Sequence, residues 1–141
     1  MTILIRLADW AAHKEQALMV RRQVFVAEHQ IPESMVSDEM DALSLHALAI
    51  DSHGSVLGAG RLLPNGRIGR MAVLAGARGI GVGGHMLQRL MQAAAERGDR
   101  CLGLSATVQA QGFYARYGFY TLGDEYAEAG ILHIEMEYIV S

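Results

Sequence analysis

The feature that most constrains this chain is a glycine-rich turn between a short apolar segment and a run with helical spacing. The turn reads Arg78-Gly79-Ile80-Gly81-Val82-Gly83-Gly84. A helix N-terminus leaves backbone N–H groups unpaired and carries partial positive charge, so an anion placed there accepts several hydrogen bonds. Glycines let the backbone come close to that anion. The turn therefore predicts a phosphate site at a strand-to-helix junction, to which Arg78 adds a positive charge.

Two other interpretations of the turn compete with this one. An isolated glycine cluster is most often a flexible surface turn. Residues 79–84 also satisfy the G-x-G-x-x-G pattern of dinucleotide sites, which requires a parallel strand–helix–strand unit and an acidic residue at the end of the next strand. Here Asp99 comes before the next expected strand, and an expected antiparallel meander precedes the turn. The sequence therefore disfavours a dinucleotide-dependent oxidoreductase.

Length and composition indicate a globular protein of ordinary size. The 141 residues are typical of one domain with a substantial core. Hydrophobic residues make up 51% of the chain, but the apolar runs are far shorter than the roughly 20 residues that span a bilayer. The formal net charge is −3 without a basic block, which disfavours a nucleic-acid surface. We expect one domain over residues 1–141, with no membrane and no nucleic-acid partner.

Cysteine and histidine usage argues against disulfides and metal sites. Cys101 is the only cysteine, so no internal disulfide can form. The six histidines form no His-x-x-x-His pair and no Glu-x-x-His cluster, so we expect no metal. The first residues lack the apolar region and cleavage site of a secretory signal. We therefore expect a cytoplasmic protein.

Apolar periodicity predicts the order β, α, three β, α, β, α and then one or two β. Asn65-Gly66 favours a type I′ hairpin between two of the strands, and Gly98 and Gly118 are expected to end helices. Residues 30–44 have no clean period and are expected to form a loop or a broken short helix. The expected strands are residues 2–7, 46–51, 56–63, 67–74, 101–105 and 132–138, and the expected helices are residues 12–28, 85–98 and 109–117.

Two motifs resemble the GNAT superfamily of acyl-CoA N-acyltransferases. Residues 78–83 are similar to its (Gln/Arg)-x-x-Gly-x-(Gly/Ala) signature. Thr107-x-x-Ala110-x-x-x-Tyr114-x-x-x-Gly118-Phe119 resembles its second motif, in which a short helix brings a tyrosine near the thioester sulfur. Further segments resemble the ElaA-like branch, which commonly has Gln where this chain has His29 and Thr107; they are Arg22–Glu28, His29–Pro32, Asp38-x-x-Asp41, Gly60–Pro64, Ile68–Val73 and Glu128–His133.

The resemblance implies a mixed α/β fold of GNAT type. Its central, mostly antiparallel, twisted sheet of six or seven strands splays after the fourth and is flanked by helices. The implied activity is transfer of an acetyl group from acetyl-CoA to a primary amine of a small molecule or peptide, by direct attack in a ternary complex. A non-catalytic acyl-CoA sensor on the same fold is the alternative. The implied protein is a monomer or homodimer.

The resemblance also implies roles for individual residues. The Val73 N–H would polarise the thioester carbonyl, and Tyr114 would act as general acid toward the CoA thiolate, because a phenol with a pKa near 10 suits a thiol with a pKa of about 8 to 9. The residues expected to bind acetyl-CoA are Met71, Ala72, Val73, Arg78, Gly79, Ile80, Gly81, Val82, Gly83, Gly84, Thr107 and Tyr114.

The base that deprotonates the attacking amine is the least defined role. The strand before the glycine turn contains no carboxylate. Glu28 and Asp41, with His46 and His133, therefore remain as candidates for this role, and either a base or a water relay would serve. His46, Arg70 and His133 are the candidate substrate-binding residues. For each of these side chains, capping, ion pairing or core packing is an equally open interpretation.

Overall fold

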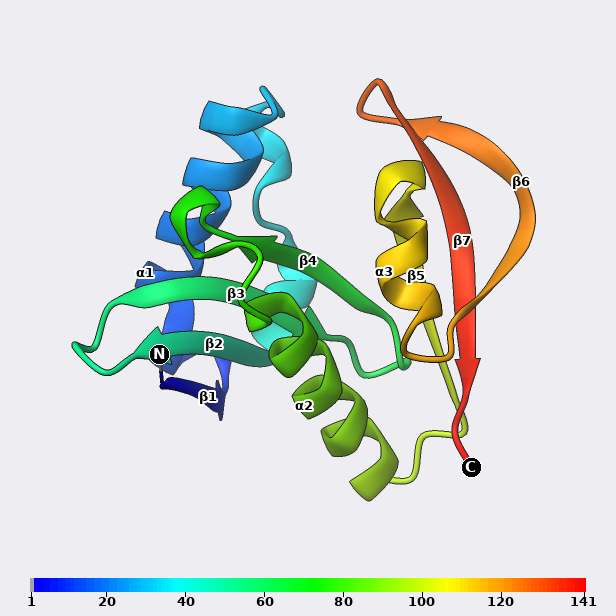
Figure 1. The fold of residues 1–141 in the computed structure, drawn as a ribbon, viewed down its shortest axis with the longest axis horizontal. Coiled ribbons are helices and arrows are strands. Elements are labelled where there is room, and N and C mark those ends of the chain that lie inside the picture. The colour runs from blue at the N-terminus through cyan, green and yellow to red at the C-terminus, as the bar shows by residue number, and fades with distance from the viewer. Residues whose placement is uncertain (1) are drawn as a thin grey trace.

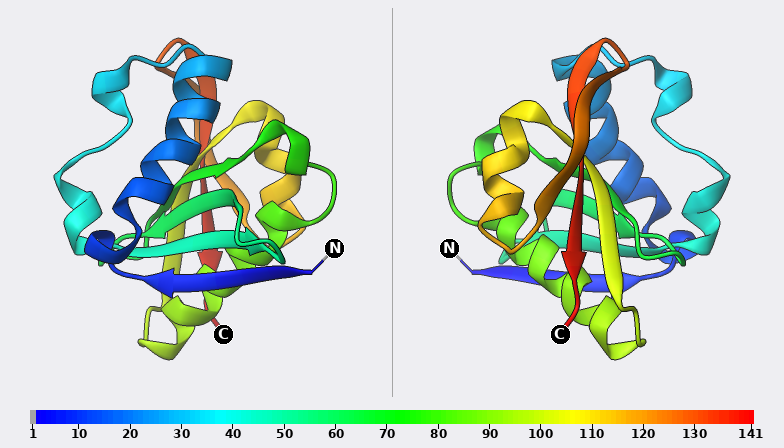
Figure 2. Two further views of the ribbon diagram at one scale, coloured as in Figure 1. Left: turned by 90° about the vertical axis from the view of Figure 1, so that its left-hand side faces the viewer. Right: turned by 90° about the vertical axis from the view of Figure 1, so that its right-hand side faces the viewer.

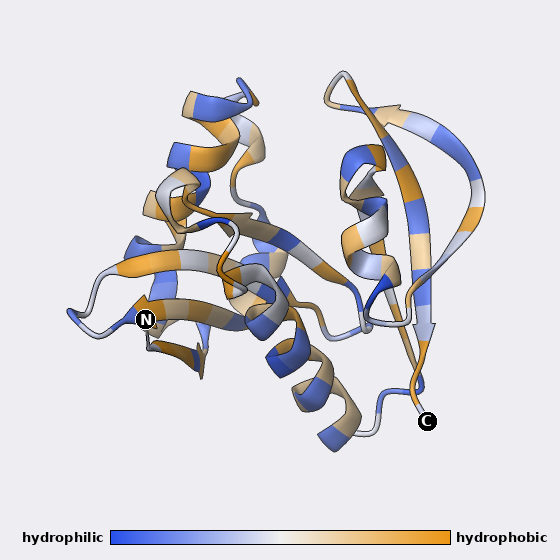
Figure 3. Ribbon diagram, viewed as in Figure 1, coloured by the Kyte–Doolittle hydropathy of each residue, from blue (hydrophilic) through white to orange (hydrophobic). Residues whose placement is uncertain are grey.

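Two antiparallel sheets meet at one end and diverge at the other (Figure 1). In the computed structural model, which describes residues 2–141, the first sheet has the order β1-β2-β3-β4 and the second the order β5-β7-β6. The strands are β1 (Ile3–Ala8), β2 (Leu45–Asp51), β3 (Val56–Leu62), β4 (Ile68–Val73), β5 (Cys101–Thr107), β6 (Tyr120–Glu128) and β7 (Ile131–Ile139). Along β7, hydrophobic and hydrophilic residues alternate (Figure 3), as expected for a strand with one buried face.

Helices cover both faces of the first sheet (Figure 2). On β2, Leu48 packs with α1, while Ala49 packs on the opposite side with α2. The helices are α1 (Trp10–Arg21), which continues as the π-helix η1 (Arg22–Glu28), α2 (Val82–Glu96) and α3 (Gln111–Ala115); the 3₁₀ turns are η2 (Glu33–Met35), η3 (Glu39–Leu43), η4 (Ala75–Ala77) and η5 (Val108–Ala110). No helix among residues 2–141 is both long and apolar enough to cross a membrane.

The two sheets touch where β4 and β5 begin. Arg67 forms a parallel bridge with Gly103, the Gly103 N–H donates to the Gly66 carbonyl at 3.1 Å, and Arg67 Nη2 lies 3.0 Å from Glu135 Oε1 on β7. Beyond this contact β5 pairs with β7 and β4 pairs with β3. The predicted mostly antiparallel arrangement, splayed after its fourth strand, is therefore confirmed, as sheets of four and three strands.

Some local expectations differ from the structure. The predicted helix 12–28 begins earlier, at Trp10, and becomes a π-helix after Arg21. The predicted type I′ turn is wrong, because Gly66 has φ +88° whereas Asn65 is not at positive φ. Pro64 fixes its own φ near −65° and so favours an ordinary type I turn, which Gly66 then follows. Gly98 and Gly118 do end their helices, with φ of +94° and +97°.

Buried ion pairs fasten the segment between η1 and β2 to the first sheet. The Asp41 side chain is almost fully buried and accepts hydrogen bonds at 2.9 Å from Arg21 Nη1, Arg21 Nη2 and Arg61 Nη1, and one from Ser37. Burial alone would raise the pKa of the Asp41 carboxyl, but the hydrogen bonds and charge of Arg21, with Ser37 and Arg61, hold that pKa well below its usual value. Asp41 is therefore ionised and fully engaged.

Asp41→Asn is expected to destabilise the protein by about 3 to 5 kcal/mol at pH 7, because it leaves the Arg21 charge buried without its partner. Because folding lowers the pKa of Asp41, its ionised carboxylate adds to the free energy of unfolding at pH values above the unfolded-state pKa near 3.8. This contribution declines as the pH falls below that pKa. Urea unfolding at pH 7 and pH 3 measures both effects. The exposed neighbour change Glu39→Gln is the control, and a loss below about 1 kcal/mol for Asp41→Asn would contradict this role.

Candidate functional site

The glycine turn forms an open helix N-terminus beside the diverging strands. Gly81 is the N-cap of α2 with φ +90°, and Gly79 has φ +81°; both conformations favour glycine strongly. Within residues 2–141, no side chain caps this end of α2. The N–H groups of its first turn therefore remain available to an anion, as the sequence predicts for a phosphate site.

Gly83 and Gly84 follow in the first turn of α2 but have different surroundings. A Cβ on Gly83 would lie 3.5 Å from Phe113 Cζ and 3.7 Å from Val73 Cγ2, which are ordinary contacts. A Cβ on Gly84 would overlap the Tyr117 hydroxyl and lie 3.1 Å from Tyr117 Cζ. Gly84 thus allows Tyr117, two residues after the end of α3, to pack closely on α2, a role that its place in the motif did not reveal.

Arg78, at the entrance of the turn, is held by Glu28 from the end of η1. Arg78 Nη2 lies 2.6 Å from Glu28 Oε1, and Nη1 contacts the other carboxylate oxygen. Arg78 Nε also donates to the Val73 carbonyl at 3.0 Å. The hydrogen bond from Arg78 lowers the pKa of the Glu28 carboxyl. The structure therefore pairs Arg78, predicted to bind phosphate, with Glu28, a predicted base that lies 50 residues away in the sequence.

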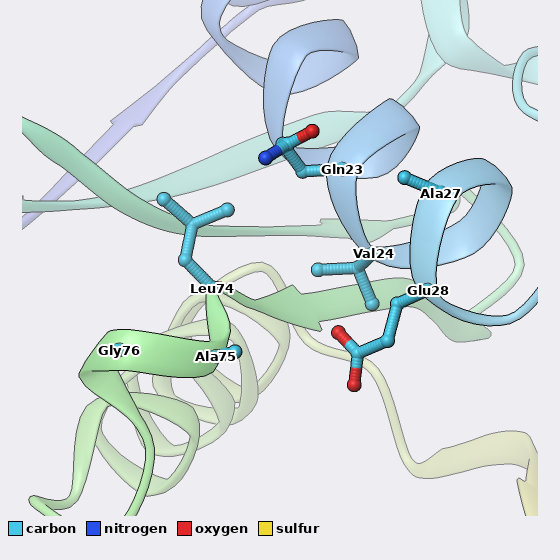
Figure 4. Close-up of a pocket in the computed structure, with 7 residues that line it drawn as sticks. All are labelled: Gln23, Val24, Ala27, Glu28, Leu74, Ala75 and Gly76. Atoms are coloured by element: carbon cyan, nitrogen blue, oxygen red, sulfur yellow. The ribbon is translucent and has the colours of Figure 1, made fainter.

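A pocket of about 420 Å³ lies beside this ion pair, between η1 and the segment that follows β4 (Figure 4). Figure 4 shows the Glu28 side chain reaching from η1 toward the side of Ala75. Apart from Glu28, none of the lining residues was predicted from the sequence as a site residue, because the pocket brings the π-helix together with the distant segment after β4. The lining residues are Gln23, Val24, Ala27, Glu28, Leu74, Ala75 and Gly76.

The edge of β4 that faces β5 is free beyond Arg67. Within residues 2–141, β4 pairs along its length only with β3. The Leu74 N–H donates to the Leu57 carbonyl of β3 at 2.9 Å. Successive N–H groups of a strand alternate between its two edges, so the Val73 N–H faces the diverging side. Met71 and Ala72 lie on the same stretch of β4, directly after a bulge at Arg70.

Tyr114 lies in α3 and packs against the core that spans both sheets. Its ring centroid is 5.0 Å from that of Phe113 and 6.0 Å from that of Phe119. Burial raises the pKa of Tyr114 to about 12. The phenol therefore stays protonated and can donate a hydrogen bond throughout the physiological pH range.

The other predicted residues do not line that pocket. His46 is buried, with Nε2 2.8 Å from the Asp41 carbonyl and its ring 4.7 Å from Trp10. Burial lowers the pKa of His46, so it is a neutral core group. The structure thus places both His46 and Asp41 in the protein interior, which favours their structural interpretation over a place in the pocket.

Two predicted residues belong to the second sheet, where Thr107 of β5 is opposite His133 of β7. His133 Nδ1 lies 2.7 Å from the Ile131 carbonyl, Nε2 lies 3.5 Å from Glu128 Oε2, and the ring stacks on Tyr126. The structure brings Val73, Arg78 and Glu28 together and leaves these two on the far strands. Among residues 2–141, no group of three or more His, Cys, Asp or Glu side chains is placed to hold a metal ion.

Comparison with known proteins gives consistent matches over nearly the whole chain. Residues 11–140 match the family model of the acetyltransferase (GNAT) domain. The uncharacterized N-acetyltransferase YjcF of Bacillus subtilis is 37% identical over 133 residues, which cover 89% of this chain and 94% of YjcF. An acyl-CoA N-acyltransferase from Pseudomonas aeruginosa is similar in structure, with 30% identity and a TM-score of 0.86 over 97% of this chain and 99% of that one.

Escherichia coli ElaA has the same fold, with a TM-score of 0.87 over 97% of this chain and 99% of ElaA. At 23% identity, the similarity is one of fold.

Gly84→Ala is expected to reduce the free energy of unfolding by about 1 to 3 kcal/mol, because the added methyl group forces Tyr117 and α3 away from α2. Gly83→Ala provides the matched control at the adjacent helical position, where the contacts leave room and alanine favours the helix by up to about 1 kcal/mol. Urea unfolding, followed by tyrosine near-UV circular dichroism, measures both variants. Equal stabilities for the two would contradict the packing role of Gly84.

Proposed function

This chain belongs to the GNAT family of acetyltransferases and is an acyltransferase, and on that basis we propose that it transfers the acetyl group of acetyl-CoA to a primary amine. The observation that carries the proposal is the position of the open N-terminus of α2 beside the free edge of β4. Phosphate groups bound at that N-terminus place the rest of an extended thioester along this edge. The reaction is direct: the amine nitrogen bonds to the acetyl carbon, and the carbon–sulfur bond breaks.

The pyrophosphate is proposed to bind the N–H groups from Gly79 to Gly84, where the helix dipole favours negative charge. Arg78 adds a bidentate donor once it exchanges part of its contact with Glu28 for phosphate oxygens. Both partners of that ion pair are more than one-third exposed, so the exchange costs little. A phosphate that takes over Arg78 also returns the Glu28 pKa toward its ordinary value.

The developing oxyanion is proposed to accept a hydrogen bond from the Val73 N–H. This donor is fixed by the pairing of β4 with β3, so it needs no reorganisation during the reaction. The role depends on the main chain, which leaves the Val73 side chain free to pack against α2.

Tyr114 is proposed to donate a hydrogen bond to the departing sulfur. Its pKa of about 12 lies roughly three units above that of a thiol, so complete proton transfer would cost about 4 to 5 kcal/mol. The proposed role of Tyr114 is therefore that of a hydrogen-bond donor rather than a full general acid. Its phenol stabilises the thiolate, and the proton that finally neutralises the thiolate comes from solvent.

Glu28 is the carboxylate proposed to receive the proton of the amine, directly or through water. It lines the pocket beside the end of β4, whereas Asp41 is enclosed by Arg21 and Arg61. A carboxylate with a pKa near its ordinary value removes a proton more readily than a carboxylate whose pKa is lowered by a neighbouring arginine. Binding of the cofactor to Arg78 therefore favours this step.

Tyr114→Phe is expected to keep CoA binding within about twofold and to lower kcat roughly 100-fold, since it removes one donor to the transition state. Calorimetry measures CoA binding and thiol release measures turnover. Tyr120→Phe is the matched control, because that hydroxyl is exposed and contacts Glu137. Unchanged turnover in Tyr114→Phe would remove this residue from the mechanism.

The activity itself is tested by following thiol release from acetyl-CoA across a panel of primary amines and amino acids, with mass spectrometry of the acetylated product. Amine-dependent release of CoA is expected. CoA binding without amine-dependent release from any panel member would contradict the proposal and favour an acyl-CoA sensor.

A further inference from the structure

A cluster of charged side chains under one face of β4 contains one more cation than anion. It consists of Arg21, Arg61, Arg70, Asp38 and Asp41. Three guanidinium groups face two carboxylates, and His46 beside them is neutral because burial lowers its pKa. The cluster therefore has a formal surplus of one positive charge.

The hydrogen bonds locate that surplus on Arg70. Arg21 makes two contacts of 2.9 Å with Asp41. Arg61 contacts Asp38 at 2.6 and 3.0 Å and Asp41 at 2.9 Å. Arg70 has the longest contact with a carboxylate, 3.2 Å from Nη2 to Asp38 Oδ2, and its Nε lies 3.4 Å from the Val36 carbonyl, to which Arg21 also donates at 3.3 Å. The two carboxylates are thus largely used by the other two arginines.

Exposure supports the same assignment. The side chains of Arg21 and Arg61 are 0% and 6% exposed, whereas that of Arg70 is 30% exposed. Burial and the neighbouring Arg61 charge lower the pKa of Arg70, while the pKa of Arg61 is raised despite burial, chiefly by its hydrogen bond to Asp38. Arg70 is therefore the guanidinium with unfilled bonding capacity and access to a ligand.

The position of Arg70 connects it to the reacting centre. Arg70 immediately precedes Met71, Ala72 and Val73 and has φ +50°, at the register shift between β3 and β4. A non-glycine residue in this conformation is strained by about 1 to 3 kcal/mol, and such strain concentrates at functional sites. The Arg70 side chain reaches the segment between η2 and η3, on the face of the sheet opposite α2 and the phosphate turn.

In the proposed complex the cofactor lies on the α2 side of β4, which leaves the opposite face for the approach of the amine. Two strand residues, about 7 Å, separate Arg70 from Ala72. The carboxylates nearest to Arg70 are already paired, Asp38 with Arg61 and Asp41 with Arg21 and Arg61. An acidic group on the acceptor would therefore meet an arginine with spare donors and little competing negative charge.

We infer that the acceptor is a compact amine that carries a carboxylate, of the size of a free amino acid, and that Arg70 binds this carboxylate. The inference rests on the proposed acetyl transfer and names the substrate class of the same site. Arginine binds carboxylates through paired N–H donors, so the interaction orients the acceptor as well as attracting it. The amine is then presented toward the stretch from Met71 to Val73.

The test compares matched acceptors that differ only in the carboxylate: leucine with isoamylamine, phenylalanine with phenethylamine, and β-alanine with ethylamine. For the acceptor pair with the highest turnover, kcat/KM is expected to be about 10- to 100-fold higher for the carboxylated member, as for a hydrogen bond to a charged group. Arg70→Gln is expected to reduce this ratio to near one, and Arg70→Lys to keep part of it. CoA-induced thermal stabilisation verifies that each variant is folded.

The possible failures are distinguishable. Decarboxylated amines that react as well as, or better than, their amino acids in the unmodified protein would overturn the inference and leave the proposed acetyl transfer intact. A ratio that is unchanged in folded Arg70→Gln would also overturn the assignment of Arg70. No acetylation of any acceptor, with or without a carboxylate, would instead contradict the proposed function itself.

Discussion

The site depends on the junction at which strands of the two sheets touch and then diverge. Arg67 and Gly103 bridge β4 and β5 at one end, and the Arg67–Glu135 ion pair closes the same end. Because β5 then pairs with β7, the rest of the β4 edge has no partner strand and presents its backbone groups. In the first sheet, β4 also runs into η4 and the N-terminus of α2. One divergence therefore supplies both a free strand edge and the phosphate turn beside it.

Charge pairing differs between the two ends of that strand. Where β4 ends, Arg78 and Glu28 form a partly exposed pair at the entrance of the turn, which a phosphate can reorganise at little cost. Nearer its start, on the face opposite α2, Asp41 is closed in by Arg21 and Arg61, which holds the segment before β2 in place. The buried network gives rigidity, while the exposed pair and the surplus charge on Arg70 remain available for ligands.

The sequence predicts the parts of the fold that depend on local chemistry. The strand-to-helix turn, the helix ends at Gly98 and Gly118, and the order of elements follow from glycine conformations and apolar periodicity. The type I′ turn at Asn65-Gly66 fails because Pro64, one residue earlier, decides the turn type. Other features depend on tertiary contacts, and no local sequence pattern predicts them. These are the π-helix η1, the bulge at Arg70 and the Glu28–Arg78 pair. The role of Asp41 is not predictable from the sequence either. An acidic side chain in an expected loop is a candidate base, and only the tertiary structure shows that Arg21 and Arg61 surround it.

The most direct test of the central claim, that the turn at the start of α2 binds the pyrophosphate of an acyl-CoA, is thermal unfolding with saturating CoA or NAD. A ligand at 100 times its Kd stabilises the folded state by about 2.7 kcal/mol. A clear rise in Tm is expected with CoA, and none with NAD at the same concentration. No rise with CoA, or an equal rise with NAD, would contradict it.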